Sequence, residues 1–157
     1  MSYAVESTRL VTFRLGEHLF AADINAVQRV LRHEPPRALP DMPEWMEGVV
    51  DYQGTMVPVI DMRRRFGMTA TTPGSQARLM VCTAPGGLAA LLVDAVLDVK
   101  PVQASEVMDP PELFRGLASE YLKGLTRRQG QLVVVLDVEV LMTSQAPLRF
   151  QQDVSGA

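Results

Sequence analysis

Two aspartates are the first candidates for chemistry in this chain. Asp61 and Asp137 each end an apolar run, and two carboxylates held close together can act as general acid and general base. Each also precedes a short stretch that favours a helix, 62–66 in one case and 138–142 in the other. A carboxylate there accepts hydrogen bonds from the first amides of the helix, worth about 1 kcal/mol. Helix capping explains both positions at once, so we expect no enzyme and no catalytic residue.

Other reactive side chains are few. The single cysteine, Cys82, lies in an apolar run and is expected to be a small buried hydrophobic residue. The two histidines, His18 and His33, form no Cys/His set at zinc-ligand spacing, and the sequence has no phosphate-loop or hydrolase-nucleophile motif. We therefore predict neither a metal site nor a cofactor.

Basic residues cluster at Arg63–Arg65 and at Arg127–Arg128. A small barrel that binds nucleic acid needs such charges beside exposed aromatic rings. Aromatic residues make up only 6% of the chain, its net charge is −3, and Phe13, Phe20 and Phe66 fall at expected core positions. We expect no nucleic-acid partner, keep a nucleic-acid-binding small barrel as the alternative of a different class, and interpret the first cluster as a solvated helix face.

The longest apolar run, 87–99, is interrupted by Asp94 and Asp98 and is too short to cross a bilayer. The first residues lack the basic start and apolar stretch of a signal peptide. These features predict a cytoplasmic protein without direct membrane insertion.

Pairs of apolar runs that flank a turn predict four hairpins. Glycines in the turns supply the positive φ that tight hairpins need. The pairs are 11–15 with 19–24, 48–52 with 55–60, 79–84 with 88–93, and 124–128 with 131–136.

The second half of the chain repeats the first. When Arg9 is aligned with Arg78, Val30 falls on Val99, and when Gly48 is aligned with Gly124, Asp61 falls on Asp137. Proline-rich segments at 31–44 and 102–120 predict irregular crossings between hairpins. Two copies of the order strand, turn, strand, short helix, crossing, strand, turn, strand and short helix predict a mainly β protein of two similar small barrels.

The helices that follow the first hairpin of each copy are expected to be capped by Asp23 or Asn25 and by Asp94. We expect a single domain over residues 1–144 made of two intertwined barrel lobes, with repeat halves 9–66 and 78–142. A C-terminal tail is expected at 145–157.

Residues 45–66, WMEGVVDYQGTMVPVIDMRRRF, resemble the signature of the CheW-like chemotaxis coupling proteins. Further parts of the chain are similar to the same family, so the resemblance runs from about Arg9 to Met142. These parts are VTFRLGEHLFAADINAVQRVL, LAALLVDAVLDV and EYLKGLTRRQGQLVVVLDVEVLM.

The resemblance implies two five-stranded SH3-like β-barrels that share a hydrophobic core, with short helices. It implies a non-enzymatic adaptor that couples the cytoplasmic tip of chemoreceptors to the regulatory domain of a CheA-type histidine kinase, with other CheW-like domains as further partners. Such an adaptor is cytoplasmic and is recruited to membrane-associated receptor arrays. A CheW-like scaffold of a specialised, non-flagellar sensory pathway is the alternative.

Family positions carried onto this sequence give two sets of site residues. The implied receptor-binding residues are Val27, Arg29, Val30, Gly48, Gln53 and Gly54, and the implied kinase-binding residues are Met56 and Pro58. Pro58 also favours a sheet edge, because proline cannot complete a strand ladder. We expect Met56 beside it to belong to an exposed apolar patch.

Two of these residues depart from the family pattern. The family commonly has an acidic residue where Arg29 stands and an arginine where Gln53 stands. The two positions are expected to face each other in typical members, so the change removes an ion pair or a salt-dependent partner contact. We hypothesise that it selects a specialised receptor and kinase pair.

Overall fold

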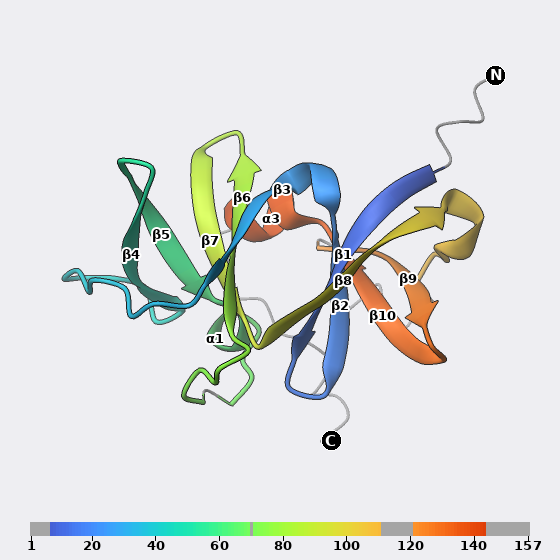
Figure 1. Cartoon of the computed structure of the whole chain (residues 1–157), viewed down its shortest axis with the longest axis horizontal. Helices are drawn as coiled ribbons and strands as arrows, with labels where there is room; N and C mark the ends of the chain where they lie inside the picture. The colour runs from blue at the N-terminus through green and yellow to red at the C-terminus, as the bar shows by residue number, and fades with distance from the viewer. Residues whose placement is uncertain (1–6, 70, 111–120, 144–157) are drawn as a thin grey trace.

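All four predicted hairpins are present in the computed structural model, which describes residues 7–69, 71–110 and 121–143 (Figure 1). The expected tail at 145–157 lies outside these residues, as does most of the second crossing. The hairpins are β1 (Ser7–Leu15) with β2 (His18–Asp23), β4 (Met46–Tyr52) with β5 (Thr55–Asp61), β6 (Arg78–Ala84) with β7 (Gly87–Val93), and β9 (Leu122–Arg128) with β10 (Gln131–Leu136).

Two further strands follow the first hairpin of each copy, where the sequence predicted a short helix and the start of a crossing. They are β3 (Val27–Arg32) and β8 (Ala95–Gln103). A 3₁₀ turn, η2 (Ile24–Ala26), precedes β3, whereas β8 follows β7 after a single bend. Both strands lie at sheet edges and are largely exposed, so they lack the apolar alternation by which a half-buried strand is recognised.

The ten strands form two five-stranded sheets, and each sheet takes strands from both halves of the chain. The first sheet has the order β8-β1-β2-β10-β9 and the second the order β3-β6-β7-β5-β4. In Figure 1 the first sheet lies on the right, where blue N-terminal strands stand beside orange C-terminal strands. Equivalent strands of the two copies occupy equivalent places in the two sheets. The two halves of the chain therefore exchange strands to form two similar sheets.

Parallel pairing joins the two copies within each sheet. Strand β10 pairs with β2 over three residues, from Val133↔Leu19 to Val135↔Ala21. Strand β5 pairs with β7 in the same way, from Val59↔Ala90 to Asp61↔Leu92. Hairpins far apart in sequence are therefore fixed to each other by backbone hydrogen bonds.

A row of aromatic rings runs through the core shared by the two lobes, each of which is built on one of the two sheets. The ring centroids of Phe13 and Phe20 are 5.9 Å apart, those of Phe20 and Phe66 are 5.5 Å apart, and those of Phe66 and Tyr121 are 5.3 Å apart. The first two rings come from the first sheet, whereas Phe66 follows β5 of the second. The three phenylalanines are buried as predicted, and their packing holds the lobes together.

Cys82 is buried in the same core and makes no disulfide, as predicted. Burial raises the pKa of its thiol to about 12. The side chain is therefore a protonated thiol that packs as a hydrophobic group.

Both predicted carboxylate caps are confirmed at the helices that end the two copies. Asp61 Oδ1 accepts hydrogen bonds from the amides of Arg63 and Arg64, at 3.0 and 3.3 Å, at the start of α1 (Met62–Arg65). Asp137 Oδ1 accepts one from Val140 N at 3.3 Å in α3 (Val138–Thr143). These contacts satisfy first-turn amides, so both aspartates have a structural role.

Asp23 also caps as predicted, because its Oδ1 accepts a hydrogen bond from Asn25 N at 2.8 Å. The prediction for Asp94 is wrong. Its Oδ2 accepts hydrogen bonds from Gly16 N at 2.7 Å and from Arg63 Nη2 at 2.6 Å. The chain passes at Asp94 directly from β7 to β8, so no helix is present there for it to cap.

The interpretation of Arg63–Arg65 as a solvated helix face is also wrong. The Arg65 side chain is buried, and its guanidinium lies 4.6 Å from the centre of the Trp45 ring. Arg63 is half-buried and forms an ion pair with Asp94, so Arg64 is the one exposed residue of the three. A helix of four residues that follows a buried strand cannot turn three consecutive side chains to solvent.

The contact between Arg63 and Asp94 is an interlobe ion pair. Arg63 lies in α1, after the second sheet, while Asp94 lies at the corner where the chain leaves that sheet for the first. Arg63 Nε also donates to both carboxylate oxygens of Asp94, at 3.0 and 3.1 Å. Since Gly16 belongs to the β1–β2 turn of the first sheet, its amide extends the link across the junction.

Removal of the Asp94 charge is expected to weaken this junction. Burial alone would raise the pKa of Asp94, but the hydrogen bonds from Arg63 and Gly16 and the charge of Arg63 bring it below its ordinary value. Because the folded pKa is lowered, the ion pair stabilises the fold above the ordinary carboxyl value of about 4, and its contribution disappears as the pH falls below it. Asp94→Asn should therefore lower the free energy of unfolding at pH 7 by about 2 kcal/mol.

Urea denaturation at a series of pH values checks this prediction. The Asp94→Asn variant should lose less stability than the unmodified chain as the solution is acidified through the carboxyl range. Asp109→Asn, at an exposed position, is the matched control for loss of one negative charge. Identical pH profiles for the Asp94 variant and the unmodified chain would contradict the assignment.

Candidate interaction surfaces

The β4–β5 hairpin extends beyond the strand that supports it. Strand β5 pairs with β4 from Thr55 to Ile60 but with β7 only from Val59 onward. Pro58 lies opposite Val49 of β4, just before the β7 ladder begins. Strand β5 is an inner strand of the sheet, but at Pro58 it has a neighbour on one side only. The missing amide of Pro58 therefore removes no hydrogen bond of the β5–β7 ladder.

Met56 lies on this projecting part of the hairpin, opposite Asp51, and 52% of its surface is exposed. It lines a shallow depression of about 410 Å³ together with residues of the first crossing and of β4. The other lining residues are Glu34, Pro35, Pro36, Arg37, Val49, Val50 and Asp51. The expected exposure of Met56 is thus confirmed, beside a depression that can accept an apolar side chain.

The turn of the hairpin has positive φ at both central residues, 52° at Gln53 and 83° at Gly54. This is the backbone of a type I′ turn, which matches the twist of the strands. Gly54 N donates a hydrogen bond to Asp51 Oδ1 at 2.9 Å. The equivalent turn, Gln129–Gly130, has the same two φ values, so the backbone shape of this turn belongs to the repeat.

Gly48 is buried where the first crossing lies against β4. A Cβ added there would come within 2.5 Å of the Arg37 carbonyl oxygen. Arg37 and Val49 exchange backbone hydrogen bonds of 2.8 and 2.9 Å, so the crossing covers the outer edge of β4. Gly124 allows the equivalent approach of Met108 to β9. The glycine predicted from the family pattern therefore has a packing role in this structure.

The other receptor-binding candidates lie on β3. Val27 is half-buried against the shared core, whereas Arg29 is exposed and Val30 is 40% exposed. Since β3 and β4 are the two edges of the second sheet, the candidate residues fall into two groups. One group is on β3, and the other is on β4 and its turn.

Contacts between edge strands show that each sheet curves toward closure. In the first sheet, Arg128 of β9 donates from Nε to Asp98 of β8 at 2.8 Å. In the second, His33, just after β3, lies 3.3 Å from Glu47 of β4. This curvature is consistent with the SH3-like barrels that the resemblance implied.

The repeat places Arg29 on Asp98, because the two residues coincide when Arg9 is aligned with Arg78. In the first sheet Asp98 forms an ion pair with Arg128 of the opposite edge strand, whereas the equivalent position of the second sheet is Arg29. Among the described hydrogen bonds and ion pairs, none joins Arg29 to Gln53, so the expected facing of these two residues gains no support. Both side chains are exposed and available to a partner.

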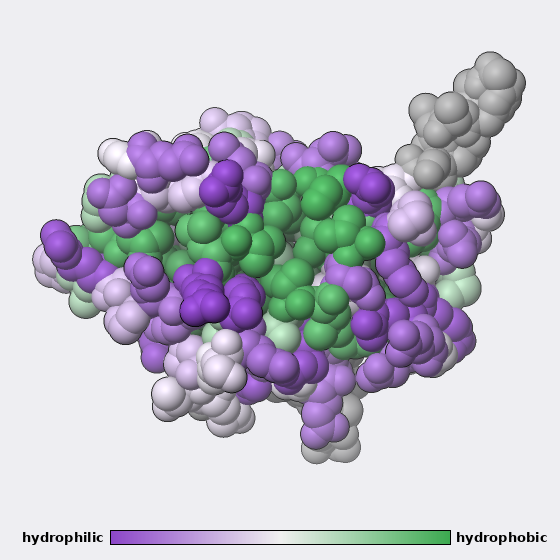
Figure 2. Space-filling model, in the orientation of Figure 1, coloured by the Kyte–Doolittle hydropathy of each residue, from purple (hydrophilic) through white to green (hydrophobic). Residues whose placement is uncertain are grey.

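Four of the exposed apolar residues, Leu39, Val99, Met108 and Leu132, were not among the predicted site residues, and two of them are related to predicted ones by the repeat. Val99 on β8 is 48% exposed and Leu132 on β10 is 42% exposed. The two alignments of the repeat place them on Val30 and Met56, so the repeat contained the signal that identifies them. Figure 2 shows an apolar band across the middle of the molecule, over the region where Figure 1 draws β3 and β8.

The chain matches the family model of the CheW-like domain over residues 9–146. The chain belongs to the CheW-like domain family. It is 29% identical to a probable chemotaxis protein CheW of Rhizobium etli, over 91% of this chain and 96% of that protein. It is 32% identical to the protein PilI of Pseudomonas aeruginosa, over 80% of this chain and 71% of the relative.

A solved structure supports the same assignment. The crystal structure of the scaffolding protein TtCheW from Thermoanaerobacter tengcongensis superimposes with a TM-score of 0.79 at 26% identity, over 88% of this chain and 94% of that one. The two curved sheets described above are thus the fold of a CheW scaffold. Members of the family are scaffold proteins rather than enzymes, and the family couples receptors to the kinase CheA.

The described residues meet the requirements of neither a metal site nor a membrane-spanning helix. No group of three or more His, Cys, Asp and Glu in this part of the chain is arranged to hold a metal ion. No helix within it is long and apolar enough to cross a membrane.

The close approach at Gly48 predicts a difference between two glycines of one hairpin. Gly48→Ala should lower the free energy of unfolding by about 3 kcal/mol, because the new methyl group collides with the Arg37 carbonyl. Gly54→Ala meets open space and should cost about 1 kcal/mol, from its positive φ alone. Urea denaturation of both variants measures the difference, and equal losses would show that the crossing does not constrain β4.

Proposed function

We propose that this chain is a non-enzymatic adaptor that couples chemoreceptors to a CheA-type histidine kinase. The observation that carries the proposal is the presence of exposed apolar side chains at two places on a CheW-like fold. One is Met56 on the β4–β5 hairpin, and the other is Val30 on β3. A protein that bridges two partners needs two docking surfaces that can be occupied at the same time.

The proposed kinase-binding surface consists of Met56, Pro58 and the depression beside them. An exposed methionine is a flexible apolar contact that adapts to the shape of a partner. Asp51, opposite Met56, gives the surface a charged border, as is usual at the rim of protein interfaces. The regulatory domain of the kinase would place an apolar side chain in the depression.

The proposed receptor-binding surface includes Val27, Arg29 and Val30 on β3. Gln53 and Gly54 are proposed to add the hairpin turn, while Gly48 contributes by holding β4 in place. An exposed edge strand with apolar and charged side chains suits an elongated partner. Since neither half of the chain contains a complete sheet, the proposed functional unit is the single two-lobed domain.

We place this adaptor in the cytoplasm, recruited to membrane-associated receptor arrays. Each contact is expected to be a small interface with a dissociation constant of micromolar order. Repetition of the contacts in an array then supplies the overall binding strength. Contacts with other CheW-like domains would extend such an assembly.

Met56 provides the direct test of the kinase surface. Met56→Asp places a charge on an exposed apolar contact and should weaken binding of a purified kinase regulatory domain about tenfold or more. The circular-dichroism melt should stay nearly unchanged, because the side chain is already half exposed. Met108→Asp, at a methionine that is 46% exposed elsewhere, is the matched control and should bind normally. If the two variants bind the kinase domain equally well, the assignment of this surface to the kinase is wrong.

A scaffold of a specialised, non-flagellar pathway is the second candidate. Arg29 and Gln53 favour it, because they change the charge of the proposed receptor surface relative to the family pattern. The 32% identity with PilI, whose name does not refer to chemotaxis, also favours it. The electrostatic change would act mainly on the choice of partner.

A pull-down with two receptor tips tests the second candidate. The chain should retain the receptor encoded beside its own gene about tenfold more strongly than a generic chemoreceptor tip. Arg29→Glu combined with Gln53→Arg restores the family charges and should reduce that preference. Equal retention of the two receptors by the unmodified chain would refute specialisation while leaving the adaptor function in place.

A further inference from the structure

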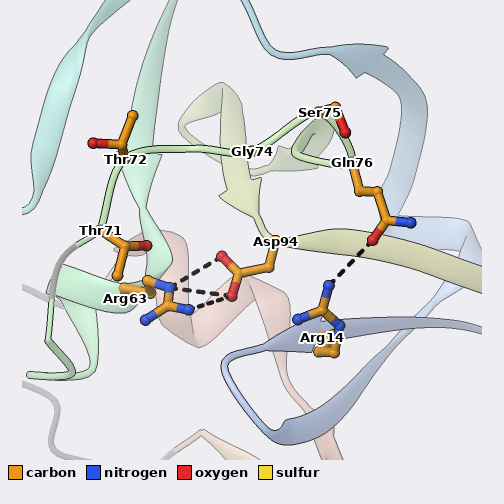
Figure 3. A pocket seen from close by; sticks show the side chains of 8 residues that line it. All are labelled: Arg14, Arg63, Thr71, Thr72, Gly74, Ser75, Gln76 and Asp94. Carbon is orange, nitrogen blue, oxygen red and sulfur yellow. Dashed lines mark hydrogen bonds and ion pairs between the residues drawn. The ribbon is translucent and has the colours of Figure 1, made fainter.

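A cavity of about 380 Å³ lies beside the interlobe ion pair (Figure 3). Its walls come from β1, from α1, from the β7–β8 corner and from the linker between α1 and β6. The lining residues are Arg14, Arg63, Thr71, Thr72, Gly74, Ser75, Gln76 and Asp94. The proposed adaptor function uses none of these residues, so the cavity is free for a separate role.

Two guanidinium groups border this space from different elements. Arg63 is held by Asp94 and donates from Nη1 to the carbonyl oxygen of Thr69 at 3.0 Å. Arg14 donates only to neutral acceptors, Gly16 O at 3.2 Å and Gln76 Oε1 at 3.3 Å. Among the ion pairs of the described residues, none involves Arg14. The guanidinium of Arg14 therefore forms none of these close ion pairs, although its charge helps to lower the pKa of Asp94.

Figure 3 shows how these groups surround the space. Arg63 lies on one side and Arg14 on the other, with the Arg14 guanidinium turned toward Gln76, and Asp94 stands between the two arginines with its carboxylate turned toward Arg63. The linker arches over the gap, and the Thr71 hydroxyl lies on the Arg63 side. The exposed residues of the linker bring hydroxyl and amide donors to the edge of the cavity. This set of donors suits an oxyanion.

The repeat shows that the fold itself does not require these arginines. A second cavity, of about 320 Å³, is lined by Asn25, Thr83 and Glu139 among other residues. The two alignments of the repeat place Arg14 on Thr83, Arg63 on Glu139 and Asp94 on Asn25. The same place in the other copy thus lacks both guanidinium groups. The positive charge is a property of one cavity, not of the architecture.

We propose that the cavity between Arg14, Arg63 and the linker binds a small phosphorylated molecule. The guanidinium of Arg14 exchanges its long hydrogen bond to Gln76 for a paired contact with phosphoryl oxygens, a geometry that arginine favours. Arg63 adds positive charge while it keeps its bond to Asp94, and the Thr71 hydroxyl donates a further hydrogen bond. The volume leaves room for a small organic group beside the phosphate.

Binding at this place connects the two lobes through the ligand. Arg14 belongs to the first sheet, whereas Arg63 and the linker follow the second. A ligand that contacts both stabilises their relative position and raises the melting temperature as its free concentration exceeds the dissociation constant. The inference does not depend on the proposed coupling of receptors and kinase.

Calorimetric titration with pyrophosphate and with inorganic phosphate tests the site in the full chain, at an ionic strength held constant with sodium chloride. Pyrophosphate should bind saturably to one site with a dissociation constant of about 100 μM. Arg14→Gln should weaken binding about tenfold or more, because it removes the fork that holds the phosphoryl group. Arg127→Gln, at an exposed arginine of β9, is the charge-matched control and should change binding less than about twofold.

Two results would overturn the proposal. One is the absence of saturable heat at pyrophosphate concentrations of about 10 mM. The other is an equal loss of affinity in the Arg14 and Arg127 variants, which would show screening of general surface charge. Circular dichroism confirms that each variant is folded. If Arg14→Gln does not fold, Thr71→Val replaces it and must weaken binding for the assignment to stand.

Discussion

The exchange of strands between the two halves is the constraint on which the whole molecule depends. Each half contributes two hairpins and one edge strand, and each sheet combines the edge strand and second hairpin of one half with the first hairpin of the other. Parallel ladders at β2–β10 and β5–β7 then fix the exchange. Because a strand without its partners leaves backbone groups unsatisfied and apolar faces in water, neither half is a stable unit alone. The aromatic row from Phe13 to Tyr121 then packs in the core that the two sheets share.

The same constraint leaves the surfaces from which an adaptor function follows. Strands β3 and β8 pair on one side only, and they carry the exposed side chains of Val30 and Val99. The β4–β5 hairpin continues past the end of its ladder with β7, and Met56 is therefore exposed without disturbing the core. Apolar side chains in these places add little to stability. They are explained better by partners than by folding.

The two copies share a backbone but differ in charge where the lobes meet. Arg63 and Asp94 join the lobes at one junction, whereas Glu139 and Asn25 stand at the equivalent positions of the other. Asp98 pairs with Arg128 between the edges of one sheet, while Arg29 occupies the equivalent place in the other. A repeated fold maintains its geometry through apolar packing and backbone pairing. Its charged positions are therefore free to diverge and to specify ligands and partners.

The sequence alone determined what depends on near neighbours in the chain. Apolar alternation and turn glycines located the four hairpins, carboxylates at strand ends located the caps, and internal similarity revealed the repeat together with the resemblance to the CheW-like family. It did not reveal β3 and β8 as strands, because exposed edge strands carry little periodicity. Nor did it anticipate that Arg63 would meet Asp94, a residue distant from it in the chain. Those features arise from pairing between distant segments, and only the tertiary structure decides which segments meet, because local patterns hold no information about long-range partners.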